Sequence, residues 1–174
     1  MWRGVPERCR LQTAALIIGT GSVPHGLAGH LVYAMRVTEI LAFEQYWADP
    51  RFINKRPNLN GSTRDAYGDN IYEFVGGSYI QQDSYHSLDT GEVNLFNLNK
   101  DTGADAVLIS DDYVYYGADG PEIPEQLRTY AGYDLCASTQ GHRCKFPAAF
   151  VGMIDDWFSA MPKRGVHGIP ADWD

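Results

Sequence analysis

The chain has 174 residues, of which 44% are hydrophobic, 13% aromatic and 21% charged, and its formal net charge is −8. This apolar and aromatic content excludes a largely disordered chain, and no apolar run approaches the ~20 residues that a membrane helix needs. The acidic balance argues against a protein that coats nucleic acid through its phosphates. The length predicts a single domain over residues 1–174. Residues 1–13 are expected to form an atypical or poorly ordered start.

The first half of the chain predicts two neighbouring strands and a short helix. Residues 14–18 form a short apolar run that ends in Gly-Thr-Gly, which is typical of a buried strand entering a turn. Residues 30–40 are rich in branched and aromatic side chains, which favours a second strand. Residues 41–47 predict one or two helical turns that end before Pro50, because a residue that precedes proline disfavours the helical conformation.

A long irregular loop is predicted over residues 52–70, and loops of this length are usually functional or disordered. Its aromatic residues favour a functional loop. Four residues in or beside this loop are basic: Arg51, Lys55, Arg56 and Arg64. They form either a small basic rim or simply a solvated charged loop, and the solvated loop is the more frequent case. A short strand is predicted over 70–74.

The second half predicts two further strands and the best helix of the chain. The strands cover residues 106–110 and 113–116, with Asp111-Asp112 between them as a bulge or a tight hairpin turn. A short helix begins near Pro124, and apolar side chains recur at helical spacing over 147–158. The predicted core is Leu16, Ile18, Val32, Ala34, Val107, Ile109, Val151, Ile154 and Trp157.

The cysteines indicate neither a disulfide framework nor a zinc site. There are three of them, an odd number, and Cys136 and Cys144 are eight positions apart with His142 between them, which is not a zinc-ribbon spacing. Cys136 is expected to be a small buried hydrophobic residue. Without an apolar leader at the start, a reduced cytoplasmic location is expected. No metal and no cofactor are predicted.

A dense polar segment over residues 81–87 is the strongest candidate for a site. Six successive hydrogen-bonding side chains are costly to bury without partners, so the segment is either a polar surface loop or a recognition surface. If it is extended, Gln82, Ser84 and His86 share one face. Neighbouring tyrosines favour a site, because aromatic rings beside amides suit flat ligands such as bases.

The order of several blocks resembles a bacterial and phage family, the nucleotide modification associated domains. The blocks include Ile18-Gly19-Thr20-Gly21-Ser22, Tyr46-Trp47-Ala48-Asp49-Pro50, Gly68-Asp69-Asn70 and Gln82-Asp83-Ser84-Tyr85-His86-Ser87, and the resemblance runs from about Ala14 onwards. It implies a role near modified DNA bases. The start of the chain departs from the family's first strand, which would leave an open sheet edge for pairing with another chain. A homodimer is therefore expected.

A weaker, topological resemblance is to the PUA-like barrels, including the EVE and YTH readers of modified bases. Together these patterns predict an α+β fold: a small PUA-like β-barrel, or a strongly bent mixed sheet, with a few packed helices. Fold likeness does not establish function.

Three functions stay open at this point. The first is a module that binds a modified nucleotide or a single base of nucleic acid in a pocket, with the predicted ligand residues Ser22, Tyr33, Trp47, Asn70, Gln82, Asp83, Ser84 and His86. The second is an enzyme that acts on a nucleotide or base, with His86, Asp83 and Asp112 as acid–base or metal groups. The third is a structural or interaction protein without a ligand. Clustered ionisable groups would favour the enzyme, and an aromatic pocket would favour the binding module.

Overall fold

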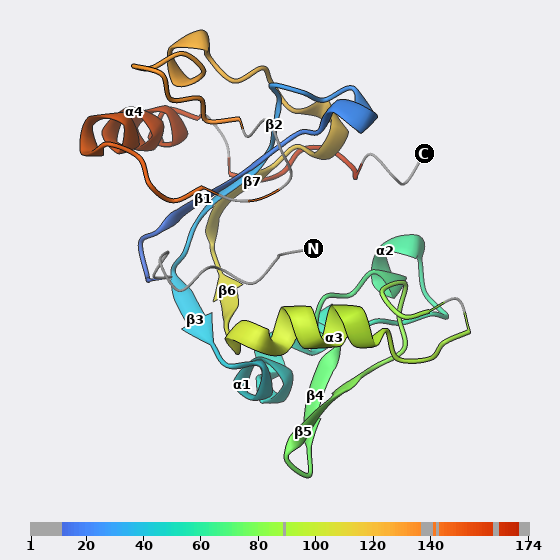
Figure 1. The fold of residues 1–174 in the computed structure, drawn as a ribbon. Coiled ribbons are helices and arrows are strands. Elements are labelled where there is room, and N and C mark those ends of the chain that lie inside the picture. Colours follow the sequence, from blue (N-terminus) through green and yellow to red (C-terminus); the bar gives the residue numbers. More distant parts are fainter. Residues whose placement is uncertain (1–11, 89, 137–140, 142, 162–163, 171–174) are drawn as a thin grey trace. The chain divides into compact units, whose positions relative to one another are not determined.

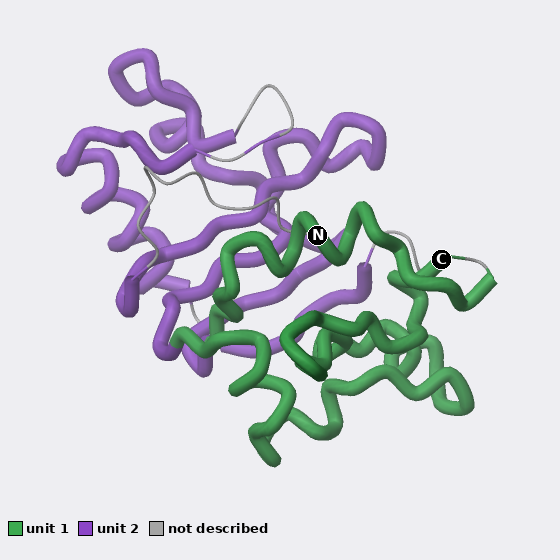
Figure 2. The backbone as a smooth tube through the Cα atoms, turned by 60° about the horizontal axis from the view of Figure 1, so that its bottom comes forward, with its two compact units in different colours: residues 1–8, 40–109 green, residues 9–39, 110–174 purple. Residues whose placement is uncertain are grey.

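The computed structural model describes residues 12–88, 90–136, 141, 143–161 and 164–170 (Figure 1). The chain forms two compact units (Figure 2). Unit 1 comprises residues 1–8 and 40–109, and unit 2 comprises residues 9–39 and 110–174. Most of unit 1 therefore comes from the middle of the sequence, and unit 2 combines the segments on either side of residues 40–109. The expectation of one domain stays a prediction, and most of its atypical start, 1–11, lies outside the described residues.

Unit 2 is built on a four-stranded sheet with the order β1-β2-β7-β8. Its strands are β1 (Leu16–Thr20), β2 (Leu31–Arg36), β7 (Asp112–Tyr115) and β8 (Gly165–Val166). The pairs β1–β2 and β2–β7 are antiparallel, and β7–β8 is parallel. This confirms that the two apolar runs of the first half are neighbouring strands. β1 extends two residues beyond its predicted end, with an irregular register between Gly19 and Thr20.

The core of unit 2 lies between this sheet and helix α4 (Ala148–Ser159), which confirms the predicted helix. Phe150, Ile154 and Phe158 repeat every four residues and are all buried, so they form the inner stripe of α4. Val151 was assigned to the core wrongly, because it falls beside this stripe and is 49% exposed. The residues buried in this core are Leu31, Ala34, Val114, Ile123, Leu127, Cys136, Phe150, Ile154 and Phe158.

The predicted core is otherwise confirmed in part. Ala34 and Ile154 are buried, and Leu16, Ile18 and Trp157 pack against the core while partly exposed. In β2 the buried residues are Leu31 and Ala34, so Val32 is only half-buried. The remaining two predicted core residues are the half-buried Val107 and Ile109, which belong to unit 1.

In its described residues, unit 1 contains two small sheets and three α-helices. The strands β3 (Glu39–Leu41) and β6 (Val107–Ile109) pair with each other, and β4 (Tyr72–Val75) and β5 (Ser78–Gln81) form an antiparallel hairpin. Helix α1 (Phe43–Ala48) packs against β4, where the Phe43 ring meets the Tyr72 ring edge-on at 5.4 Å. The other helices are α2 (Thr63–Ala66) and α3 (Leu95–Asp101).

Short 3-10 helices connect these elements. In unit 1 they are η2 (Pro50–Lys55) and η3 (Thr102–Ala104), and in unit 2 they are η1 (Val23–His25), η4 (Gly117–Asp119) and η5 (Glu125–Leu127). The predicted helix near Pro124 is thus the single turn η5. The predicted end of α1 before Pro50 is confirmed, because η2 begins there.

Two predicted long runs each divide into strands of different sheets. Residues 30–40 divide into β2 and β3, and residues 106–116 divide into β6 and β7. The hydroxyl of Ser110 donates to the Arg36 carbonyl at 2.6 Å and accepts from the backbone N–H of Asp112 at 3.0 Å. These side-chain bonds satisfy backbone groups where the strand is interrupted. The prediction of a hairpin turn at Asp111-Asp112 is therefore wrong, because β6 pairs with β3 and β7 pairs with β2.

The architecture is a mixed α+β fold with several small sheets and few helices. The described strands do not close into a barrel, so the PUA-like barrel is not confirmed. None of the helices in the described ranges combines the length and the apolar character needed to cross a bilayer. Cys136 is buried and free, as expected, whereas Cys144 is disulfide-bonded, a bond that the cysteine pattern did not indicate.

Candidate functional site

The connection between α1 and η2 brings Trp47 and Arg56 together. Asp49 caps η2, because its side chain accepts from the backbone N–H of Arg51 at 2.9 Å, and Pro50 occupies the first position, where no N–H is needed. The six residues of η2 then turn the chain back, so that the Arg56 guanidinium lies 3.8 Å from the centre of the Trp47 ring. Arg56 Nη2 also donates to the Trp47 carbonyl at 2.6 Å. One tryptophan face is thus covered by a planar cation.

The loop that follows Arg56 is held by its own hydrogen bonds. Ser62 and Asp65 form a reciprocal capping box at the start of α2, with the Ser62 N–H donating to Asp65 Oδ2 at 2.9 Å. The backbone N–H of Asn58 donates to the Asp65 carbonyl at 2.9 Å, and the N–H of Asn60 donates to Asn58 Oδ1 at 3.1 Å. The long loop predicted over 52–70 is therefore ordered, and part of it forms one wall of the pocket described below.

Close backbone approach fixes the base of this wall. A Cβ on Gly68 would lie 2.5 Å from the Lys55 carbonyl oxygen and 2.6 Å from the Pro57 nitrogen, so only glycine fits there. Asn70 is 2% exposed, and its side-chain amide donates to the carbonyls of Tyr46 at 3.3 Å and Phe52 at 3.2 Å. Asn70 thereby joins the end of α1 to η2 and holds the segments that carry Trp47 and Arg56 together.

The second wall of the pocket is formed by the turn that follows β5. The N–H of Gln82 donates to the Ile71 carbonyl at 2.7 Å, and its side-chain Nε2 donates to Glu73 Oε2 at 2.8 Å. A carboxylate accepts hydrogen bonds only, so this contact fixes the amide orientation and leaves Gln82 Oε1 as an acceptor. The strand ends at Gln81, which corrects the picture of residues 82–86 as one extended face.

The turn over residues 82–87 is stabilised from within. Ser84 is 6% exposed, its Oγ accepts from the His86 N–H at 3.1 Å, and its own N–H donates to Ser87 Oγ at 3.1 Å. The side chains of Gln81 and Asn97 both donate to the His86 carbonyl, at 3.4 and 3.2 Å. The side chains of Ser84 and Ser87 are therefore engaged with the backbone of the turn, whereas Asp83 and Tyr85 are exposed.

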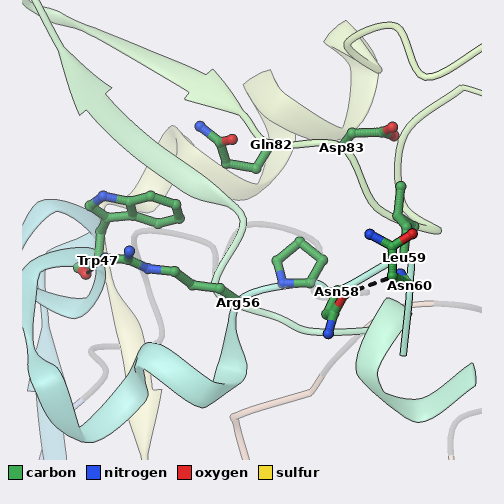
Figure 3. A pocket seen from close by; sticks show the side chains of 8 residues that line it. Trp47, Arg56, Asn58, Leu59, Asn60, Gln82 and Asp83 are labelled. Atoms are coloured by element: carbon green, nitrogen blue, oxygen red, sulfur yellow. Dashed lines mark hydrogen bonds between the residues drawn. The ribbon is translucent and has the colours of Figure 1, made fainter. Parts of the chain in front are cut away.

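A pocket of about 390 Å³ opens between the two walls within unit 1 (Figure 3). Figure 3 shows Trp47 and Arg56 stacked at one end, Leu59, Asn60 and Asp83 at the other end, and Gln82 between them. The volume lies in the range of small-molecule sites. The full lining is Trp47, Arg56, Pro57, Asn58, Leu59, Asn60, Gln82 and Asp83.

Charge is distributed unevenly along this pocket. The charged lining residues are Arg56, whose guanidinium lies against Trp47, and Asp83, whose carboxylate lies at the other end. Within the described residues no donor forms a hydrogen bond with the Asp83 carboxylate. Of the predicted basic rim, Arg51 pairs with Asp49 at 2.6 Å, and the exposed Lys55 and Arg64 lie outside the lining.

His86 lies behind the turn and does not line the pocket. Its ring meets the Tyr67 ring edge-on at 5.7 Å and forms a hydrogen bond with the Tyr67 backbone. Burial lowers the pKa of His86 below the ordinary histidine value, against the opposing influence of Asp101 and Asp69. The imidazole is therefore neutral at pH 7.

The other predicted site residues have different surroundings. Ser22 and Tyr33 belong to unit 2; Ser22 precedes η1, and burial raises the pKa of the Tyr33 phenol. Asp112 also belongs to unit 2, where Arg36 Nε lies 3.4 Å and Arg164 Nε 2.5 Å from its carboxylate. Trp47, Gln82 and Asp83 line the pocket, whereas the side chains of Asn70 and Ser84 bond to backbone groups beside it. The ligand roles of all eight residues stay predictions.

The sequence reasoning did not name several of the lining residues as ligand contacts. Pro57, Asn58, Leu59 and Asn60 all come from the loop that was predicted as irregular and functional, and Arg56 was placed only in a basic rim. The signal that could have identified them is the combination of a tryptophan, an arginine nine residues later and two amides just beyond it. No group of three or more His, Cys, Asp or Glu side chains in the described part of the chain is arranged to hold a metal ion.

Comparison with known proteins points to one family. No curated protein and no solved structure matches the chain. The sequence matches the family described as nucleotide modification associated domain 2 over residues 8–174, which is nearly its whole length. The chain therefore belongs to the nucleotide modification associated domain 2 family.

Proposed function

We propose that the pocket of unit 1 binds the base of a nucleotide or nucleoside, and that the protein is a binding module for such a ligand. The observation that carries this proposal is the Trp47–Arg56 stack beside the fixed Gln82 amide. Proteins that recognise unpaired bases stack them on aromatic rings or guanidinium planes and read their edges with amide groups. The family description, which concerns nucleotide modification, supports the same ligand class.

The hydrogen-bonding groups define how a base would be read. Arg56 covers one face of the Trp47 indole, so the base stacks on the other face. Gln82 Nε2 is engaged by Glu73, so Gln82 presents its Oε1 acceptor to the ligand. A base with an N–H or amino group on its exposed edge would therefore bind best. A modified base is included in the proposal, because the family description concerns nucleotide modification.

Binding is proposed ahead of catalysis because of the composition of the lining. Arg56 and Asp83 are its charged members, and His86 lies outside it. General acid–base catalysis places a titratable side chain, most often histidine, within hydrogen-bond reach of the proton that moves. The catalytic and the purely structural alternatives stay open to test by product analysis and by the binding experiment below.

The test is isothermal titration calorimetry of the full chain with adenosine, guanosine, cytidine, uridine, and 5-methylated and 5-hydroxymethylated cytidine. At least one ligand should bind, and Trp47→Ala should weaken it by about 1–3 kcal/mol, the value of one base–aromatic stack. Trp47→Phe keeps a flat ring and should lose less. The control is Tyr85→Ala, which removes an aromatic ring that is 58% exposed and outside the lining.

Two results would contradict the proposal. One is the absence of heat with every nucleoside when the protein is folded, as judged by circular dichroism. The other is binding that responds equally to Trp47→Ala and Tyr85→Ala.

A further inference from the structure

We infer that the Asp83 end of the pocket binds a pair of adjacent hydroxyl groups, so that the ligand is a nucleoside with a free vicinal diol and without a phosphate at that end. This inference rests on the proposed function, since it takes the base to lie at Trp47. It adds the chemical class of the second half of the ligand. The observations that carry it concern Asp83, its neighbours and the separation of the two charged lining residues.

The two ends of the pocket differ in chemistry. At one end, Trp47 and Arg56 offer flat stacking surfaces, and at the other end Asp83 and Asn60 offer polar groups, with Gln82 between them (Figure 3). A nucleoside has the same division into a flat base and a polar sugar. With the base on Trp47, the sugar would point along the pocket toward Asp83.

The Asp83 carboxylate is placed to receive hydrogen bonds from a ligand. It is exposed, lines the pocket and is not engaged by a donor among the described residues. An ionised carboxylate is an acceptor with two oxygens, and hydroxyl groups form short, strong bonds to it. Two adjacent hydroxyls can each donate one hydrogen bond, one to each oxygen.

Gly91 keeps one side of this carboxylate clear of side chains. A Cβ at Gly91 would lie 3.2 Å from Asp83 Oδ2, which is a tight contact, and Gly91 has a φ of +80° that favours glycine. The Gly91 N–H donates to the Leu88 carbonyl at 2.8 Å and so fixes this turn. The carboxylate is therefore set against bare backbone on one side and the pocket on the other.

The neighbouring amides complete a surface for hydroxyl groups. Asn58 Oδ1 accepts from the Asn60 N–H, so Asn58 Nδ2 is the group left to donate to a ligand oxygen. Asn60 is exposed and offers both a donor and an acceptor. Hydroxyl groups, which both donate and accept, match such a mixture of carboxylate and amides.

A phosphate fits this end poorly. Arg56 is the cation in the lining, and it is held at the other end by the Trp47 ring and carbonyl. A phosphate near Asp83 would face an unneutralised carboxylate, and like charges in contact are unfavourable. The net charge of −8 adds to this repulsion. A ribose and a glucosyl group attached to a modified base both present vicinal hydroxyl pairs, and the experiment separates them.

The test compares ligands that share one base, chosen as the ribonucleoside that binds tightest among adenosine, guanosine, cytidine and uridine. Calorimetry is performed with this ribonucleoside, its 2′,3′-dideoxy analogue, its 5′-monophosphate and, for cytosine, glucosylated 5-hydroxymethyl-2′-deoxycytidine. The ribonucleoside should bind at least tenfold more tightly than the dideoxy analogue, and the 5′-monophosphate more weakly than the ribonucleoside. Tighter binding of the glucosylated deoxynucleoside than of cytidine would assign the diol to a base-linked sugar, which also supports the inference.

Asp83→Asn should remove most of the tenfold preference, because one acceptor oxygen becomes a donor. Glu44→Gln is the matched control, since Glu44 is an exposed acid of unit 1 outside the lining. Equal affinity for the ribonucleoside and the dideoxy analogue, with no gain from the glucosylated deoxynucleoside, would overturn this inference and leave the proposed function standing. An unchanged preference for the diol ligand in Asp83→Asn would do the same. Tighter binding of the 5′-monophosphate would also overturn it. If none of these ligands binds the folded protein, the proposed function fails together with the inference.

Discussion

The guanidinium carbon of Arg56 lies 3.8 Å from the centre of the Trp47 ring, and Nη2 of the same side chain donates to the Trp47 carbonyl at 2.6 Å. Two contacts to one residue fix both the plane and the position of the guanidinium. Arg56 Nε is buried without a hydrogen-bond partner among the described residues, so the stack and the Nη2 bond carry the interaction. Trp47 is in turn held as a rigid platform at one end of the pocket.

Arg56→Lys should lower the free energy of unfolding by about 1–2 kcal/mol. The ammonium of lysine is compact and cannot stack as a plane on the indole ring, so the cation–π contact is weakened. Urea unfolding followed by circular dichroism measures the change. Arg64→Lys is the control, since Arg64 is exposed and outside the lining, and its effect should be near zero. Equal effects of the two substitutions would show that the stack has no energetic role.

Asn70→Ala should destabilise the protein by about 1–3 kcal/mol, because it leaves the carbonyls of Tyr46 and Phe52 without their donor in a buried site. Asn60→Ala, on an exposed loop position, should change the unfolding free energy little. Both are measured by urea unfolding without ligand. A stable Asn70→Ala protein that has lost nucleoside binding would instead assign Asn70 to ligand contact, as the sequence suggested.

The lowered pKa of His86 predicts that stability rises with pH. Between the folded-state pKa and the ordinary value of ~6.5, the unfolded chain binds more protons than the folded chain. The contribution of His86 is therefore complete above about pH 6.5 and is lost as the pH falls through the folded-state pKa. Urea unfolding at pH 5 and pH 7.5 should show a smaller pH difference in His86→Gln than in the parent chain. An identical difference would contradict this account.

Ile154→Ala should cost about 2–5 kcal/mol of unfolding free energy, because Ile154 is 6% exposed and packs in the core of unit 2. Val151→Ala, three residues earlier on the same helix, should cost far less because Val151 is 49% exposed. Thermal or urea unfolding distinguishes the two. A larger loss in Val151→Ala would reverse the assignment of the buried face of α4.

Local patterns in the sequence predicted much of the fold. The apolar spacing of α4, the proline that ends α1, and the two adjacent apolar runs of β1 and β2 were sufficient for correct elements. Helix α3 and strand β5 were missed. Leu95 and Phe96 on α3 are 64% and 73% exposed, so this helix lacks the buried stripe from which helices are recognised. Residues 30–40 and 106–116 each divide into strands of two different sheets, with Ser110 at the point of division in the second run. The Ser110 side chain bonds to the Arg36 carbonyl, and a local pattern does not reveal a contact between residues 74 positions apart.

The candidate site was predicted in part for a similar reason. Trp47, Gln82 and Asp83 were named because aromatic and polar side chains stand out locally. The position of Arg56 over Trp47 depends on η2 and on the buried Asn70, and neither has a pattern that indicates a pocket. The grouping of Ser22 and Tyr33 with Gln82 came from composition alone, and the first two belong to unit 2.

The most direct test of the account is a nuclear magnetic resonance titration of the 15N-labelled full chain with the ribonucleoside that binds in calorimetry. The indole N–H of Trp47 and the side-chain amides of Asn58 and Gln82 report on the pocket without any substitution. The account predicts that these three signals shift together and saturate at the calorimetric affinity, while the indole signal of Trp157 in unit 2 stays in place. Saturable shifts confined to unit 2, with the three pocket signals unmoved, would contradict it.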